Sequence, residues 1–206
     1  MSRKIAPVDC RINRLQIGKT ARFFESMAKL EETSIEPGFA SHALARLGEV
    51  PPFLRSLLVA DGTVTMALEA YFDEVIRIST TGQEPVKLAA AIPVLNMQSG
   101  DDCYFRQVDL IGETSGTCYA SATSILNKKA IGDRLFEQLV DEHIGIGVIL
   151  RNSARGSFRE VLNVARGGLA TEFDVHRTYR VSLNGAPVIL ITEEFPMSVY
   201  ESGVGF

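Results

Sequence analysis

The sequence predicts an α+β fold in which helices pack on a single antiparallel sheet. Helical patterns cluster in the first third of the 206 residues, and strand patterns dominate the rest. Short turns, GETSG and Asn184-Gly185, join pairs of strands directly, without the helix that a parallel connection needs. A hydrophobic content of 46% suits one compact unit of this length.

Residues 1–51 are predicted to form a helical elaboration in front of a main domain that spans residues 52–206. Apolar side chains recur in this segment at loose helical spacing, at Leu15, Phe23, Phe24, Met27 and Leu30. The EPG sequence then breaks the pattern before a second apolar stretch at 39–47. The segment indicates helical packing but no particular function.

The next elements follow from local patterns along residues 52–200. Two short helices are expected in 52–72, joined by Asp61 and Gly62, with Thr63 capping the second helix. An amphipathic helix is expected after Asn127, because Ile131, Leu135, Phe136, Leu139 and Val140 form one stripe. Strands are expected at 74–79, 85–95, 103–110, 117–125 and 157–164, followed by a hairpin over 176–200.

In the first hairpin, residues directly opposite each other share a face of the sheet. If Gly112 pairs with Gly116, Arg106 lies opposite Ala122 and shares its face with Val108. Small residues on the neighbouring strand would leave room above the guanidinium. Since its planar fork matches a carboxylate, Arg106 is a candidate anion-binding residue.

In the second hairpin, Asn184-Gly185 is the signature of a type I′ turn, which predicts Arg180 opposite Ile189. Glu193 then shares its face with isoleucines, a phenylalanine, Thr178 and Arg180, which is how a binding pocket is lined. Neighbouring Glu194 alternates to the opposite face, where we expect it to be solvated or to cap the strand end, without a functional role. A simpler reading also applies to each charged residue alone: it could pair elsewhere or reach water at a sheet edge.

Composition and motifs exclude several other functions. The formal net charge of -4 and pI of about 5.5 provide no positive field for nucleic acid or anionic lipid. No apolar run approaches the roughly 20 residues of a membrane span, so we expect a cytoplasmic protein. Three cysteines, expected to be free thiols, and three histidines lack the spacing of a metal site: Cys10, Cys103, Cys118, His42, His143 and His176. No Walker A, GxSxG or dinucleotide-binding loop occurs.

Four segments together resemble the chorismate lyase superfamily, and within it the 4-hydroxybenzoate synthase branch. They are LRSLLVADGTVTMALE, FRQVDLIG with ATSIL, IGVILRNSARGSFRE and RTYRVSLNGAPVILITEEFPMSVY. Their order holds over residues 52–200, which is more specific than one short motif. The resemblance implies a chorismate lyase-like sheet with a closed, largely apolar cavity. It also implies elimination of pyruvate from chorismate, or a close analogue, without a cofactor.

The resemblance assigns roles to individual positions. It implies that Arg106 binds the ring carboxylate and Glu193 meets the ring oxygen, the two residues that the hairpin argument also selects. Ile146 and Gly147 match the backbone amide region that assists the arginine. Val64 and Thr65 match pocket-lining positions, whereas a second arginine of some members corresponds to Ser121.

Two alternatives remain open at this point. A related fold serves as the effector domain of transcription regulators, so the chain could be a non-catalytic binding module for a small aromatic carboxylate. No helix-turn-helix pattern supports DNA binding by this chain itself. The pocket could also serve an enzyme with another carboxylated ring as substrate. We expect a small-molecule partner and a monomer or homodimer.

Overall fold

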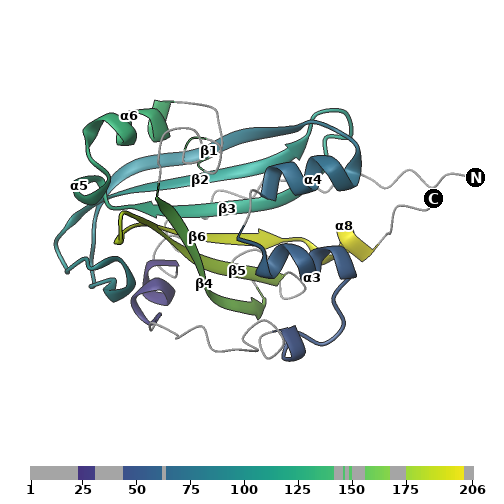
Figure 1. Cartoon of the computed structure of the whole chain (residues 1–206), viewed down its shortest axis with the longest axis horizontal. Helices are drawn as coiled ribbons and strands as arrows, with labels where there is room; N and C mark the ends of the chain where they lie inside the picture. Colours follow the sequence, from purple (N-terminus) through teal and green to yellow (C-terminus); the bar gives the residue numbers. More distant parts are fainter. Residues whose placement is uncertain are drawn as a thin grey trace, which may run out of the picture.

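The protein has the predicted α+β architecture, with one six-stranded antiparallel sheet (Figure 1). The computed structural model describes residues 23–30, 44–61, 64–141, 146, 149, 156–167 and 175–201. Strands follow the order β1-β2-β3-β6-β5-β4 across the sheet. Their bounds are Ile76–Lys87, Asp102–Gly112, Cys118–Leu126, Ser157–Arg166, Val175–Leu183 and Ala186–Phe195 for β1 to β6.

Helices α3 (Pro52–Val59) and α4 (Val64–Phe72) form where two short helices were predicted. They lie in front of the sheet in Figure 1, while α8 (Met197–Glu201) lies at its right-hand end. The helix expected after Asn127 is divided into α5 (Lys128–Ile131) and α6 (Asp133–Asp141). Gly132 between them has a positive φ of 82°, which ends α5. Thr63, the predicted cap of α4, lies outside the described residues.

Each face of the sheet carries its own hydrophobic core. The face under α3 and α4 packs residues such as Leu54, Leu68 and Ile189. The opposite face packs Phe23 and Met27, from a helical stretch at 23–28, against residues that include Phe105 and Leu190. This stretch is helical and packs on the sheet, whereas Leu15 lies outside the described residues and the separate N-terminal unit stays a prediction.

The strand predicted over 85–95 is wrong beyond its first residues. β1 runs without interruption from Ile76 to Lys87, with a bulge between Thr80 and Gly82. The chain then enters a short 3-10 turn, η1 (Pro93–Leu95), closed by Asn96 with a φ of 54°. Pro93 has no backbone N–H to donate to a sheet, which favours the turn over a strand.

The register predicted for the first hairpin is wrong by two residues, but its faces are correct. Arg106 lies opposite Ser124, and Val108 opposite Ala122. A bulge between Leu110 and Ile111 and a wider turn each add one residue. Because side chains alternate with a period of two, a shift of two leaves each one on its predicted face.

In the second hairpin, the pairing predicted for Arg180 is wrong by one residue, which exchanges the faces of β5. The turn pairs Leu183 with Ala186 as expected, but a bulge on β6 then places Arg180 opposite Leu190. Arg177 and Tyr179, not Thr178 and Arg180, share the face of Glu193. Pro187 lies at the bulge, where a missing N–H is tolerated.

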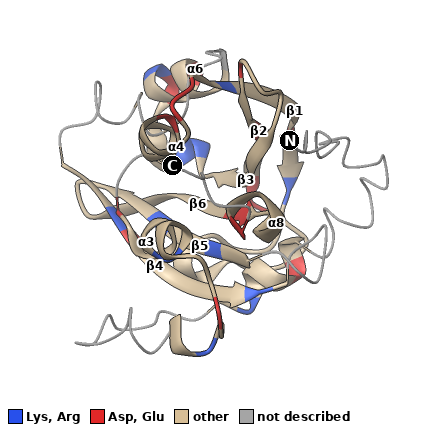
Figure 2. Ribbon diagram, turned by 90° about the vertical axis from the view of Figure 1, so that its right-hand side faces the viewer, with Lys and Arg blue, Asp and Glu red and all other residues tan. Residues whose placement is uncertain are grey.

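Three further observations bear on the composition arguments. Within the described part, no helix is long and apolar enough to cross a membrane. Cys103 is a buried free thiol as predicted, but Cys118 forms a disulfide, so the expectation of free thiols is wrong for that residue. In Figure 2, basic and acidic residues are scattered over several elements of the ribbon seen from this side.

Candidate functional site

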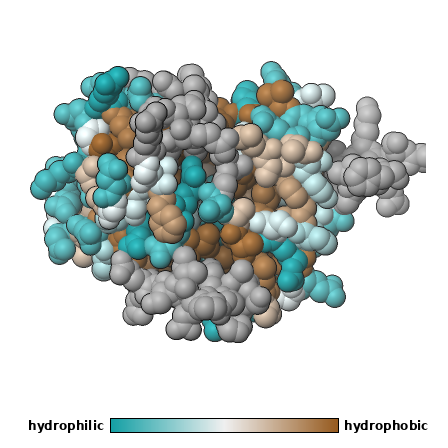
Figure 3. Space-filling view, in the orientation of Figure 1, coloured by the Kyte–Doolittle hydropathy of each residue, from teal (hydrophilic) through white to brown (hydrophobic). Residues whose placement is uncertain are grey.

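A pocket lies between the sheet and the start of α4, on the face that also carries α3. The empty space within it and at its open mouth amounts to about 530 Å³. Figure 3 shows hydrophobic side chains in the middle of this face, bordered by polar ones. The lining residues are mostly apolar, and their polar members are Thr65, Arg106, Ser124, Arg159, Tyr179 and Glu193.

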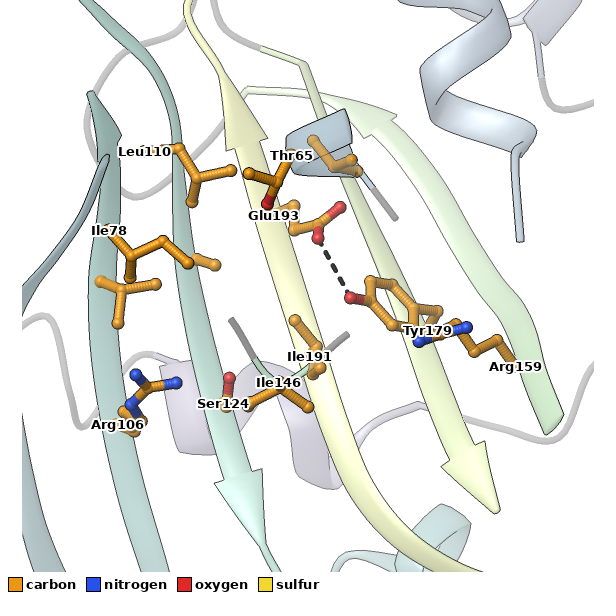
Figure 4. A pocket seen from close by; sticks show the side chains of 13 residues that line it. Thr65, Ile78, Arg106, Leu110, Ser124, Ile146, Arg159, Tyr179, Ile191 and Glu193 are labelled. Atoms are coloured by element: carbon orange, nitrogen blue, oxygen red, sulfur yellow. Dashed lines mark hydrogen bonds between the residues drawn. The ribbon is translucent and has the colours of Figure 1, made fainter. Parts of the chain in front are cut away.

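Arg106 projects from β2 into one side of the pocket (Figure 4). Its side chain is 2% exposed, yet Nε and Nη2 have no hydrogen-bond partner among the described residues. Burial lowers the pKa of this guanidinium, and the nearby Tyr104 raises it in part. Since a buried charge without an acceptor is costly, the arrangement suits an anionic ligand that supplies the acceptor oxygens.

Glu193 projects from β6 on the other side of β3 (Figure 4). Its Oε2 accepts a hydrogen bond from Arg177 Nε at 2.7 Å, and its Oε1 accepts one from the Tyr179 hydroxyl at 3.0 Å. Both oxygens therefore have a donor, which fixes the orientation of the carboxylate. A carboxylate has about four acceptor positions, so Glu193 can still accept a hydrogen bond from a ligand hydroxyl.

Arg177 connects Glu193 to helix α3. It is 1% exposed, and its Nη1 donates to the carbonyl oxygens of Leu57 and Ala60 at the end of α3. Burial alone would lower the pKa of Arg177, but the charge of Glu193, its hydrogen bond, and the nearby Tyr179 and Asp61 together outweigh burial, so the net shift is upward. α3 has no basic residue in its last turn, so Arg177 provides the cation that its C-terminal carbonyls favour.

Tyr179 completes this polar group. Burial raises the pKa of its hydroxyl, and the neighbouring Glu193 carboxylate adds to the increase, so the phenol stays protonated as a donor. The Arg177 guanidinium also stacks 5.0 Å from the centre of the Tyr179 ring. The result is a rigid polar wall around Glu193.

Arg159 is a second pocket cation that sequence reasoning did not select. It comes from β4 and lies alongside Tyr179, across the pocket from Arg106 (Figure 4). Its Nη1 donates to the backbone carbonyl of Asp61 at 3.3 Å, and it has no ion pair among the described residues. The charge of Arg159 also lowers the pKa of Tyr179, although burial dominates that shift.

Most residues named from the sequence meet in this pocket. Arg106, Glu193, Val64, Thr65 and Ile146 all line it. Figure 4 shows Thr65 beside Glu193, and Ile146 beside Ser124 at the Arg106 side. Gly147 lies outside the described residues.

The predictions for Arg180 and Glu194 need correction. Arg180 does not face the pocket, because the bulge on β6 turns it to the other face. There its guanidinium donates to Glu160 at 2.5 Å and to the Val94 carbonyl at 3.2 Å. Glu194 also lies on that face, but it is buried, with 8% of its surface exposed, and therefore not solvated as expected.

The described residues contain no group of three or more histidine, cysteine, aspartate or glutamate side chains that could hold a metal ion. His176 lies on the face opposite the pocket, where its Nδ1 contacts the Gly167 carbonyl. His42 and His143 lie outside the described residues. The pocket therefore offers arginine, carboxylate and hydroxyl groups, which bind and orient polar substituents of a ligand.

Much of this chain is similar to known proteins. A family described as "Chorismate pyruvate-lyase Rv2949c-like" matches residues 58–202. A chorismate pyruvate-lyase of Mycobacterium leprae is 28% identical over 159 residues, which cover 72% of this chain and 76% of that protein. The effector domain of PhnF from Mycobacterium smegmatis is 12% identical, with a TM-score of 0.48 over 68% of this chain and 91% of that one. The C-terminal domain of a histidine utilization repressor from Pseudomonas syringae gives a TM-score of 0.45 at 12% identity over 60% of this chain and 92% of that one.

Proposed function

This chain belongs to the Rv2949c-like chorismate pyruvate-lyase family, and on that premise we propose that it eliminates pyruvate from chorismate to give 4-hydroxybenzoate. The observation that carries the proposal is the pairing of two unlike polar groups across one apolar pocket. Arg106 has no acceptor among the described residues, and Glu193 is a fixed acceptor. A ring with a carboxylate at one end and a hydroxyl at the other satisfies both.

The spacing of the two groups supports a single-ring ligand. Arg106 lies opposite Ser124 on β3, and Glu193 lies opposite Ala122, two residues further along. Their Cα atoms are therefore separated by two strand spacings, about 10 Å, and two residues along the strand, about 7 Å. Both side chains point into the space between, where Ala122 and Ser124 leave room for a ring (Figure 4).

The reaction breaks the ether bond between the ring and the enolpyruvyl oxygen. The ring carbon that bears the hydroxyl loses its hydrogen, the ring becomes aromatic, and the enolpyruvyl methylene gains a proton to give pyruvate. Atoms and electrons balance without an oxidant, a reductant or a metal. Aromatisation makes the step downhill, so the protein mainly has to hold a reactive conformer in a dry pocket.

Each polar residue has a distinct role in this scheme. Arg106 anchors the ring carboxylate, and Ile146 lines the same side of the pocket. Glu193 accepts a hydrogen bond from the ring hydroxyl and thereby fixes the orientation of the carbon that loses its hydrogen. Because Arg177 and Tyr179 already donate to its two oxygens, orientation explains the arrangement of Glu193 better than proton donation does.

Kinetics of two variants test these roles. Arg106→Gln should raise KM for chorismate by about tenfold to a hundredfold, since it removes a charged hydrogen-bond partner. Glu193→Gln should mainly lower kcat, because its contact orients the reacting carbon. Conversion is followed through the ultraviolet absorbance of the aromatic product, with pyruvate measured by a coupled assay. Small and equal effects of both substitutions would contradict the assignment of the site.

The same assay separates catalysis from a pure binding function. A binding module would take up 4-hydroxybenzoate saturably and leave chorismate unchanged. An enzyme for another carboxylated ring would also leave chorismate unchanged, but it would convert its own substrate. The proposal requires that 4-hydroxybenzoate and pyruvate form at a rate proportional to protein concentration.

A further inference from the structure

The charges around the pocket indicate a ligand with two negative charges. Three arginines lie at or directly behind its wall, Arg106, Arg159 and Arg177, and the carboxylate among them is Glu193. Arg177 forms an ion pair with Glu193 at 2.7 Å, so these two charges cancel. Arg106 and Arg159 remain without an ion pair among the described residues. The described wall therefore has an excess of two positive charges.

The two uncompensated arginines enter the pocket from opposite sides. Arg106 belongs to β2 and Arg159 to β4, and β3, β6 and β5 lie between them. Four strand spacings correspond to about 19 Å between the strands, and both side chains reach inwards across that gap (Figure 4). One carboxylate cannot bridge this width, whereas a ring with two separate carboxylates can contact both guanidinium groups.

Arg159 is held less firmly than the other two arginines. Arg177 is fixed by Glu193 and two carbonyl oxygens, but Arg159 makes one hydrogen bond of 3.3 Å to the carbonyl of Asp61. The Asp61 side chain itself is exposed to solvent. Arg159 thus keeps most of its five donors for another partner, while it lies beside Tyr179 on the Glu193 side of the pocket.

We infer that Arg159 binds the second carboxylate of the substrate, the one on the enolpyruvyl group that leaves as pyruvate. This inference rests on the proposed function. In chorismate the enolpyruvyl ether is attached next to the hydroxyl-bearing carbon, so its carboxylate comes to the same side of the pocket as Glu193. Arg159 then distinguishes the substrate, which has two carboxylates, from 4-hydroxybenzoate, which has one. It also offsets the repulsion between that carboxylate and Glu193.

A comparison of substrate and product tests the inference. In Arg159→Gln, KM for chorismate should rise about tenfold or more, while Kd for 4-hydroxybenzoate should change less than about twofold. Arg159→Lys should recover part of the loss, because it keeps the charge. Arg77→Gln is the matched control, since it removes one positive charge from an exposed position on β1, next to Ile78 but on the other face. Equal losses for chorismate and 4-hydroxybenzoate, or no change in KM, would overturn the assignment.

A pair of unreactive ligands keeps this test separate from the proposed function. 3-(Carboxymethoxy)benzoate and 3-methoxybenzoate differ by one carboxylate, and their Kd values can be measured by calorimetry whether or not chorismate is converted. The wild-type protein should bind the dicarboxylate more tightly, and Arg159→Gln should remove that preference. A wild-type protein that does not convert chorismate but shows this preference would refute the lyase proposal alone. Equal affinities in the wild-type protein would refute the role of Arg159 even if chorismate is converted.

Discussion

Arg106 and Glu193 are both buried, but they differ in what surrounds them. Both oxygens of Glu193 accept hydrogen bonds from Arg177 and Tyr179, whereas two nitrogens of Arg106 have no acceptor in the described part of the chain. Burial of a charge is tolerated when partners replace the lost water. The hydrogen-bonded Glu193 therefore stabilises the fold as well as lining the site, whereas the buried charge of Arg106 lowers the stability of the fold.

This asymmetry predicts opposite effects on stability and on binding at Arg106. Arg106→Met removes an uncompensated buried charge and keeps an unbranched apolar side chain. We expect the unfolding free energy to increase by about 1 kcal/mol, which raises Tm by about 2–4 °C in a chain of this size. Binding of 4-hydroxybenzoate should be lost. Calorimetry and thermal unfolding of the same sample measure both, and a lower Tm would mean that Arg106 has a structural role instead.

Asp109 lies on the face opposite the pocket, and its burial should make the stability of the protein depend on pH. It is 3% exposed and accepts one hydrogen bond, from Ser121 at 2.7 Å. Burial raises the pKa of this carboxyl above its usual value of 3.8, and the Ser121 bond offsets only part of that rise. The native state therefore binds more protons than the unfolded state in a window that begins near pH 3.8, and stability falls as pH rises through it.

Asp109→Asn should remove this penalty. At pH 7 we expect Tm to increase by a few degrees, because the neutral amide needs less solvation than the carboxylate. The difference from the wild-type protein should shrink as the pH falls, because protonation of the wild-type carboxyl removes its charge. A gain in Tm that does not depend on pH would contradict this explanation.

At the scale of elements, Arg177 attaches strand β5 to the end of helix α3 and to Glu193. Arg177→Met should lower the unfolding free energy by about 3–5 kcal/mol, because it leaves a buried carboxylate and two carbonyl oxygens without this partner. Urea unfolding measures the loss. Adding Glu193→Gln should recover part of it, since the unpaired carboxylate is then removed. Losses that simply add in the double variant would show that the two residues are not coupled.

The two hairpins show how far the sequence determines the site. In the first, the wider turn and the bulge each added one residue, and the resulting shift of two residues left Arg106 on the predicted face. In the second, a single bulge exchanged the faces of β5, and Arg177 and Tyr179 took the place predicted for Arg180 and Thr178. Pro187 was the available signal, because proline in a central strand is confined to its start or to bulges.

The roles of Arg177 and Arg159 were not predicted from the sequence, and each omission has a physical cause. The contact of Arg177 with α3 joins residues 120 positions apart, and no local pattern encodes it. Arg159 enters the pocket because β4 lies at the edge of the sheet next to β5, and strand order is not evident from turn signals alone. The alternation along β6, by contrast, follows from local sequence, and Glu193 was placed correctly with Ile191.

At the scale of the whole molecule, the sheet separates two different environments. One face carries α3, α4 and the pocket, and the other packs on residues 23–28 and η1. All six strands contribute lining residues to the pocket, together with α4 and Ile146, so its wall joins residues from Val64 to Glu193. Ligand binding should therefore stabilise the fold as a unit, not one element alone.

This coupling predicts a thermal shift. At a concentration one hundred times its Kd, 4-hydroxybenzoate should stabilise the native state by about 2.7 kcal/mol. For a chain of this size the corresponding rise in Tm is about 5–10 °C. Benzoate, which lacks the hydroxyl that meets Glu193, should need a higher concentration for the same shift. Equal concentration dependence for both ligands would argue against the contact with Glu193.

The most direct test of the central claim is to add chorismate to the purified protein and quantify both products. The account predicts one pyruvate for each 4-hydroxybenzoate, at a rate proportional to protein concentration, and near-complete loss of product formation in the Arg106→Gln, Glu193→Gln double variant. Folded wild-type protein that leaves chorismate unchanged, or a double variant as active as the wild type, would contradict it.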